Sequence, residues 1–253
     1  MPEPQNLEEQ IVSQAAERSV SDQLAAAEQI DIYVQTDFLK IVQGQADAVT
    51  VAGQGLVTKQ NLRVQEIKLK TDGIAINPVK AIFGQIQLHK PVNLIARIIL
   101  NEADINYNLS SDFARQLVHK FELDIDEVIY KFELEDLQII LPGDTEIELI
   151  GTIHIKAENN RHTLGFNALF CPRTDSRPII LKRFHCTQGE GVSLEFIVPL
   201  MQKVQELVNL PYLEWEDIKF RIKNLQAQKE NLILLVEANL NQVPDSLTEM
   251  IQT

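Results

Sequence analysis

The sequence predicts an α+β protein in which a long, curved antiparallel sheet wraps one or more helices. Apolar and polar residues alternate over many segments of strand length, which is the pattern of half-buried strands. These segments follow one another in runs, whereas a parallel sheet would have a long helix after each strand. With 253 residues, 45% of them hydrophobic, the chain can bury a sizeable core. We expect a single domain over residues 1–253.

The first predicted element is an amphipathic helix over about residues 6–27. Asn6 followed by Glu9 three residues later is the pattern of a capping box. Apolar residues then recur at helical spacing, beginning with Ile11 and Val12. The polar face carries acidic residues such as Glu8 where a membrane-surface helix would carry a row of lysines. We therefore expect this helix to pack against the protein.

A strand-rich body is predicted over about residues 29–192, and it begins with a strand followed by a short helix. Residues 30–34 alternate, as in a strand with one buried face. Asp37 is expected to cap a helical turn that Gly44 ends, because glycine takes the left-handed conformation without a Cβ penalty. Residues 74–84 repeat this pattern, with an Asn-Pro pair at the predicted helix start and glycine at its end.

The strands between these two units are expected to be curved. Gly53 and Gly55 fall on the apolar parity of their strand, where missing side chains leave room for curvature or for a close neighbour. In the next strand the apolar parity changes between Val64 and Ile67, which predicts a β-bulge. A bulge would bend the strand further.

Another helix interrupts the strands in the middle of the chain. Asn101 with Asp104 predicts a helix start after a strand over residues 92–100, and Ser111 offers a second start. Strands resume at about Val128.

Residues 146–156 give the cleanest alternation of the chain. The members of the apolar parity are Ile147, Leu149, Gly151, Ile153 and Ile155. The other parity carries charged and polar residues, so one face is expected to be wet and the other buried. The missing side chain of Gly151 could leave space for a ligand.

The last part, about residues 193–244, is predicted to form a helix and a hairpin. Pro199 lies in the first helical turn, or at a kink if the helix already begins at Ser193. Residues 213–241 follow as two strands around a turn at 228–231.

Charge and hydropathy limit the partners and the cellular location that we expect for the protein. The 36 acidic and 23 basic side chains give a net charge of −13, which repels nucleic acid and anionic membranes. The N-terminus has no basic region followed by an apolar stretch, and no segment approaches the roughly 20 apolar residues of a membrane span. We expect a cytoplasmic protein, or one peripheral to a membrane through transient and mainly hydrophobic contact.

Cys171 and Cys186 are predicted to be free thiols. They flank a turn at 172–178. A hairpin around this turn would set Cys171 opposite about Pro178 and Cys186 opposite about His162, so that the two thiols stay apart.

The sequence shows no motif for catalysis, metal binding or a cofactor. The five histidines are scattered and form no zinc-binding pattern. A nucleophile elbow, a phosphate loop and a complete dinucleotide-binding glycine pattern are all missing. Carboxylate pairs such as Glu133 with Glu135 share one strand face, which is typical of a solvated surface. We expect a non-enzymatic protein without a cofactor, because a hydrolase would need a nucleophile motif.

Several stretches together resemble one family. They are Val34-Gln-Thr-Asp37, Gln43-Gly-Gln-Ala-Asp47, Val51-Ala-Gly-Gln-Gly-Leu-Val57, Leu62-Arg-Val-Gln-Glu-Ile67, Ile74-Ala-Ile-Asn-Pro78, Leu100-Asn-Glu-Ala-Asp104, Leu213-Glu-Trp-Glu-Asp217 and Asn239-Leu-Asn-Gln-Val-Pro244. In this order they resemble the LmeA-like phospholipid-binding proteins, once classed as a domain of unknown function, and in particular their cyanobacterial type. The resemblance runs from about residue 11 to residue 244.

The resemblance implies a tubular lipid-binding fold similar to that of BPI, in which a twisted sheet wraps a long helix and encloses an apolar groove. It implies binding of a phospholipid or fatty acid by a carrier or sensor, and it brings no catalytic motif. The alternative is an interaction or assembly factor with a filled core. Strand and helix parity alone gives the candidate lipid-binding residues: Val49, Val51, Leu69, Ile98, Phe113, Leu117, Ile147, Leu149, Ile153 and Ile155.

Overall fold

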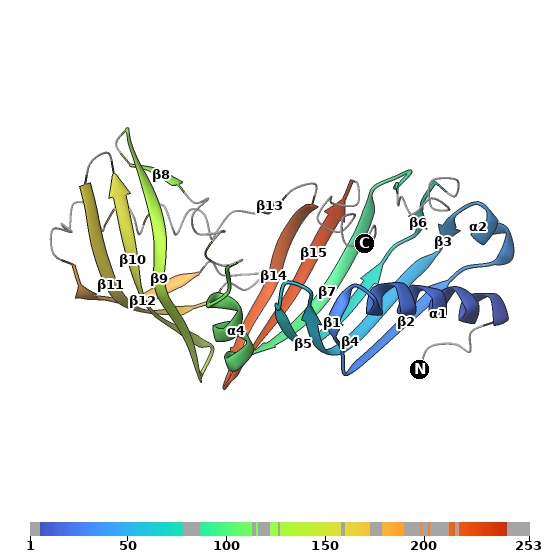
Figure 1. Cartoon of the computed structure of the whole chain (residues 1–253), viewed down its shortest axis with the longest axis horizontal. Helices are drawn as coiled ribbons and strands as arrows, with labels where there is room; N and C mark the ends of the chain where they lie inside the picture. The colour runs from blue at the N-terminus through green and yellow to red at the C-terminus, as the bar shows by residue number, and fades with distance from the viewer. Residues whose placement is uncertain are drawn as a thin grey trace.

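A computed structural model describes residues 6–77, 87–112, 115, 122–125, 127–157, 160–172, 179–189, 198, 202, 213–215 and 218–241. Most of these residues form two antiparallel sheets that follow one another along the long axis of the molecule, with a short helix between them (Figure 1). The predicted α+β class is confirmed. The predicted helix at 78–84 lies outside the described residues, and of the one within 193–211 only residues 198 and 202 are described, both of them helical.

The larger sheet has eight strands in the order β1-β4-β5-β7-β15-β14-β13, and β2 also pairs with β4. The strands are β1 (Leu24–Ala26), β2 (Gln29–Gln35), β4 (Ala48–Thr58), β5 (Arg63–Thr71), β7 (Val92–Asn101), β13 (Leu213–Trp215), β14 (Ile218–Gln228) and β15 (Asn231–Leu240). The pairing of β15 with β7 adds the predicted C-terminal hairpin to this sheet, with β13 as its outer neighbour. Strands β3 (Gln45–Ala46) and β6 (Ile74–Ala75) form a separate pair.

The smaller sheet has five strands in the order β12-β11-β10-β9-β8. They are β8 (Glu122–Ile125), β9 (Val128–Gly143), β10 (Glu146–Ala157), β11 (Asn160–Cys171) and β12 (Ile180–Gln188). Strands therefore resume slightly before the predicted position, and each strand pairs with the next one in the chain.

Three helices begin at the residues that the sequence indicated. In α1 (Leu7–Ser21), α2 (Phe38–Val42) and α4 (Glu102–Leu109), an Asn or Asp side chain accepts a hydrogen bond from a backbone N–H of the first turn. The capping residues are Asn6, Asp37 and Asn101. Helix α1 ends earlier than residue 27 because Leu24 already pairs with β4.

Helix α1 lies along the free edge of β2 in the position of a neighbouring strand. Three alternate backbone N–H groups, two in β2 and one in the residue after it, donate to α1 side chains: Ile32 to Glu17 at 3.0 Å, Val34 to Ser13 at 2.9 Å and Thr36 to Glu9 at 3.2 Å. The acceptors are four residues apart, a rise of about 6 Å, and two strand residues span about 6.8 Å. The helix thus satisfies backbone N–H groups of an edge strand that could otherwise pair with a strand of another chain.

Helix α4 joins the two sheets. The Asn106 side chain bonds the backbone of Ile139 in both directions, at 2.8 and 2.7 Å. The Glu102 carboxylate accepts from the Leu141 N–H at 2.7 Å, and the Leu141 carbonyl accepts from Glu230 in the β14–β15 turn at 3.1 Å. Buried apolar residues from both sheets and α4 fill this junction: Ile105, Leu141, Ile147, Ala227 and Leu232.

The predicted bulge between Val64 and Ile67 is wrong. The pairing of β4 with β5 keeps one register past this point, with Leu56 opposite Val64. The irregular residue is on the partner strand, where Gly55 has a φ of 58°. A left-handed residue turns β4 locally, so the apolar parity changes without an extra residue in β5. A close neighbour also fills the other glycine position, since a Cβ on Gly53 would lie 2.9 Å from the Leu56 side chain.

The predicted hairpin of the two cysteine-bearing strands is confirmed, but its register differs. Cys171 lies opposite Ile180, and Cys186 lies opposite Phe166. Two register shifts between β11 and β12 explain why counting residues from the turn gave other partners. Both cysteines are free, as predicted.

Candidate functional site

The eight-stranded sheet has one apolar face, to which six strands contribute. Directly opposed residues of antiparallel strands lie on the same face, so the registers define rows across the sheet. The central row is Ile32, Val51, Leu69, Ala96, Val236 and Ile222. The row beside it is Ile30, Gly53, Ile67, Ile98, Leu234 and Leu225. Neither row contains a charged residue.

The face continues toward the end of the sheet at which α2 lies. Val34 stands opposite Val49 there, and Thr71, Leu94, Ala238 and Phe220 form the rest of this third row. Val34 is buried beneath the neighbouring elements, whereas Val49, like Val51 of the central row, is only half-buried. The face therefore keeps accessible apolar surface.

The opposite face of the same sheet carries its charged residues, together with apolar ones such as Ile95, Ile99 and Ile233. Glu66 lies 2.9 Å from Lys68 and 3.4 Å from Arg97. Glu237 binds both Lys223 at 2.7 Å and Arg221 at 2.6 Å. Hydrogen bonds from these two cations hold the pKa of the Glu237 carboxyl below its usual value. These charges thus pair with one another away from the apolar face.

The five-stranded sheet also has two different faces. Its mainly apolar rows are Ile139, Leu149, Ala168 and Phe184; Leu137, Gly151, Phe166 and Cys186; Leu134, Ile153 and Leu164; and Phe132, Ile155 and His162. The predicted alternation of residues 146–156 is therefore confirmed.

Ion pairs cover the wet face of this sheet. Glu133 binds Lys156 and Arg161, and His154 lies 3.2 Å from the Glu135 carboxylate. The carboxylates singled out in the sequence therefore belong to a paired, solvated surface, as predicted. On the same sheet a hydrogen bond to Glu146 raises the pKa of Lys182.

The two apolar faces meet at the junction of the sheets. Leu100, Leu225 and Leu234 of the large sheet pack against the junction core. Ile139 and Phe170 of the small sheet pack against it as well. Apolar side chains of both sheet faces thus pack against one shared core.

The structure places the described candidate residues on these two faces. Those on the large sheet are Val49, Val51, Leu69 and Ile98, and those on the small sheet are Ile147, Leu149, Ile153 and Ile155. Phe113 and Leu117 lie outside the described residues.

The space predicted beside Gly151 is not there. A Cβ at this position would lie 2.6 Å from the carbonyl oxygen of Asp136 and 2.9 Å from the Leu137 side chain. Strand β9 therefore fills the site of the missing side chain. Ile147 and Ile155 on either side are only 3% and 1% exposed, which shows that protein already packs against them.

Sequence reasoning missed the contribution of the C-terminal hairpin to the large apolar face. Its members are Phe220, Ile222, Leu225, Leu234 and Val236. Residues 232–236 are all apolar, so their alternation is invisible in the sequence. Glu237, which faces the polar side with Arg221, was the one signal that could have fixed their parity.

Within the described part of the chain, no three His, Cys, Asp or Glu side chains gather closely enough to hold a metal ion. Nor is any helix in that part long and apolar enough to cross a membrane.

Comparison with known protein families identifies a match over most of the chain. The model of a family described as LmeA-like phospholipid-binding matches residues 5–237. Neither a curated protein nor a solved structure matches significantly.

Proposed function

Because the chain belongs to the LmeA-like phospholipid-binding family, we propose that it binds a phospholipid or fatty acid along the apolar face of its large sheet. The observation that carries this proposal is the pair of uncharged rows that cross six strands. A membrane lipid has one large apolar part, and this face offers apolar side chains without a charge to desolvate.

The dimensions of the face suit an acyl chain. Six strands about 4.8 Å apart give a row about 24 Å long, and one leaflet of a bilayer core is only about 15 Å deep. Sheltering a chain of about 16 methylenes at roughly 0.8 kcal/mol each offers on the order of 12 kcal/mol before association and ordering costs. Apolar contact alone thus supplies a gross free energy of the same order as those costs.

We propose a carrier or sensor rather than an enzyme. The charged side chains that flank the two sheets pair with one another on the polar faces, for example Glu237 with Arg221 and Glu133 with Lys156. The two central rows of the large sheet bring no acid, base or nucleophile next to a bound chain. A tubular fold similar to BPI, with the lipid in a groove between sheet and helix, is the architecture that we propose for the complex.

A second candidate function is protein interaction or assembly around a filled core. It is favoured by the five-stranded sheet, where Ile147 and Ile155 are buried and Leu137 occupies the space at Gly151. Part of its apolar face is therefore packed by the protein itself. The two candidates differ in whether the large sheet holds lipid.

Lipid uptake by delipidated protein tests the proposal. We expect saturable binding of a fluorescent fatty acid or phospholipid at micromolar concentration. Leu69→Ser and Ile98→Ser, which place a hydroxyl on the apolar face, should weaken it. Thr50→Ser, on the other face of β4, is the matched control. A folded, delipidated protein that takes up neither probe would favour the interaction factor.

A further inference from the structure

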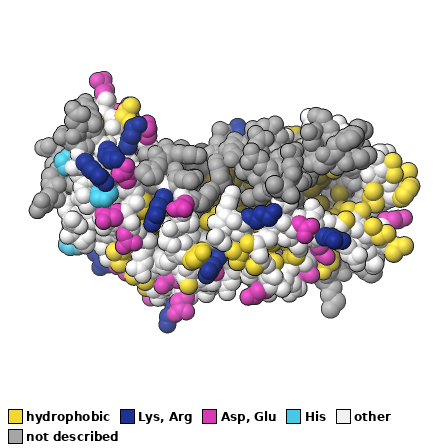
Figure 2. Space-filling view, in the orientation of Figure 1, with side chains coloured by type: hydrophobic (Ala, Val, Ile, Leu, Met, Phe, Trp, Pro, Cys, Tyr) yellow, Lys and Arg dark blue, Asp and Glu magenta, His cyan; other side chains and the backbone are white. Residues whose placement is uncertain are grey.

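Apolar side chains are exposed at the end of the molecule that carries α2. Phe38, Leu39 and Val42 are 62%, 71% and 63% exposed, and we call these three residues the α2 tip. Positions i, i+1 and i+4 lie within about 100° of one another on a helix, so the three point the same way. Figure 2 shows hydrophobic side chains gathered at the end where Figure 1 places α2. Ile11 on α1 is also exposed.

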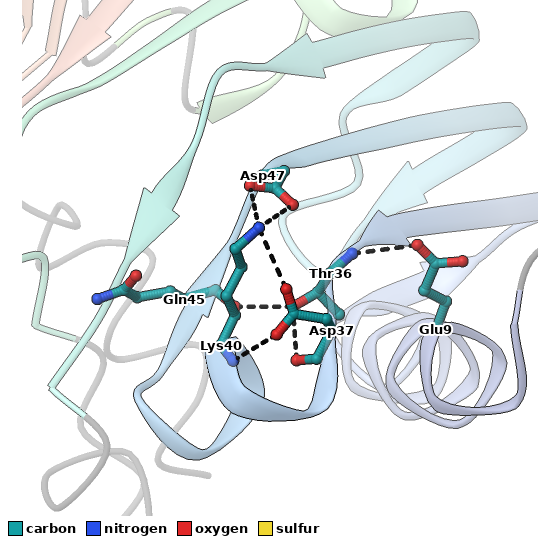
Figure 3. A network of polar contacts seen from close by, with 6 residues as sticks. All are labelled: Glu9, Thr36, Asp37, Lys40, Gln45 and Asp47. Atoms are coloured by element: carbon teal, nitrogen blue, oxygen red, sulfur yellow. Dashed lines mark hydrogen bonds and ion pairs between the residues drawn. The ribbon is translucent and has the colours of Figure 1, made fainter.

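Polar contacts hold the α2 tip in place (Figure 3). The Asp37 carboxylate accepts from the Lys40 N–H at 2.9 Å, and Lys40 Nζ binds both carboxylate oxygens of Asp47 at 2.7 and 2.8 Å. The Thr36 hydroxyl donates to the Gln45 carbonyl at 3.0 Å. Both ends of the α2 segment are thus fixed to β2 and β3. These contacts hold the helical turn that carries the exposed apolar side chains.

The charges beside the tip exclude attraction to an anionic surface. Lys40 is the only cation of α2, and it pairs with Asp37 and Asp47, which also raise its pKa. The chain as a whole carries a net charge of −13. An occupant of the tip must therefore be recognised by apolar contact, and it must not add negative charge.

The tip is also too small for a stable protein interface. Such an interface buries about 800 Å² and 20–30 residues on each partner. Three side chains on a five-residue helix present far less. A few exposed apolar side chains on a convex end suit the interface of a bilayer, into which they can insert one by one.

We propose that the α2 tip docks the protein on bilayers with zwitterionic headgroups by inserting Phe38, Leu39 and Val42 among the acyl chains. Strand β2 leads from Val34, in the apolar face, directly to the tip. A lipid that leaves the bilayer at the tip would meet the half-buried Val49 first, since Val34 beside it is buried. The passage of lipid from the bilayer to the sheet rests on the proposed lipid-binding function, whereas the docking itself does not.

Flotation with phosphatidylcholine vesicles tests the docking. We expect the full chain to float with the vesicles, independently of salt, and to float less as phosphatidylglycerol replaces phosphatidylcholine. The variant Phe38→Gln, Leu39→Gln, Val42→Gln should partition about a hundredfold more weakly.

The control removes three exposed apolar side chains from the five-stranded sheet, at the other end of the molecule. It combines Ile129→Gln, Ile180→Gln and Leu181→Gln, whose wild-type side chains are 54%, 46% and 46% exposed. It should float like the wild type. Leu39→Gln alone should weaken partitioning into vesicles about tenfold. This single variant is used in place of the triple variant if circular dichroism shows the triple variant to be unfolded.

Lipid uptake in the absence of vesicles separates docking from lipid binding. The tip variant should take up monomeric fluorescent fatty acid as the wild type does, but should extract lipid from vesicles more slowly. A wild type that does not float, or tip and control variants that lose flotation equally, overturns the docking site. The docking site is also overturned if the wild type is a dimer and the tip variant is a monomer. The α2 tip would then bind a second copy of the chain. Flotation without any lipid uptake upholds the docking and contradicts the proposed function.

Discussion

At the scale of single residues, the sequence predicts what depends on near neighbours. Asn6, Asp37 and Asn101 cap helices as expected, because each cap needs only residues two or three positions away. The acceptor role of Ser13 could not be predicted, because its donor lies 21 residues further along the chain. In the sequence it is one of several polar residues on an amphipathic helix.

Replacing Ser13 with alanine should destabilise the protein by about 1–3 kcal/mol. The substitution leaves the buried N–H of Val34 without its acceptor, and an unsatisfied buried donor costs about that amount. Urea denaturation measures the change. Ser19→Ala, on an exposed position of the same helix, is the matched control and should stay within about 0.5 kcal/mol. Equal stability of the two variants would show that the bond to β2 contributes nothing.

At the scale of elements, strand patterns were predictable and their exact pairing was not. The alternation of residues 146–156 gave β10 and both of its faces, because the polar and apolar parities are clean. Register depends on both partners, so the shifts between β11 and β12 were invisible from the turn alone. The same holds for Gly151, whose apparent space is filled from the neighbouring strand.

The β11–β12 register predicts two free thiols. Cys171 and Cys186 lie opposite Ile180 and Phe166, so neither sulfur faces the other. Thiol titration of denatured, unreduced protein should find two thiols per chain. Finding none after oxidation-free purification would mean that the register of this hairpin is wrong.

At the scale of the whole molecule, the arrangement depends on contacts between distant segments. The pairing of β15 with β7 and the bonds from α4 to β9 build one junction out of three parts of the chain. No pattern of neighbouring residues in the sequence predicts such contacts. The predicted curved sheet is therefore, in the structure, two sheets joined by α4 and a shared core.

Leu141→Ala should destabilise the whole molecule by about 2–5 kcal/mol, because it opens a cavity in the junction core. Far-ultraviolet circular dichroism in urea should show a lower midpoint. Leu181→Ala, at an exposed position of β12, removes the same atoms at little cost and is the control. A loss below about 1 kcal/mol would mean that the junction does not hold the sheets together.

The central claim is that the apolar face of the large sheet holds a lipid, and native mass spectrometry of the purified protein before and after organic extraction tests it most directly. We predict that the native protein carries an extra mass equal to one phospholipid or fatty acid, that extraction removes this mass, and that added lipid restores it. A protein that shows only its bare mass before extraction, and still does so after incubation with phospholipid and fatty acid, would contradict the claim.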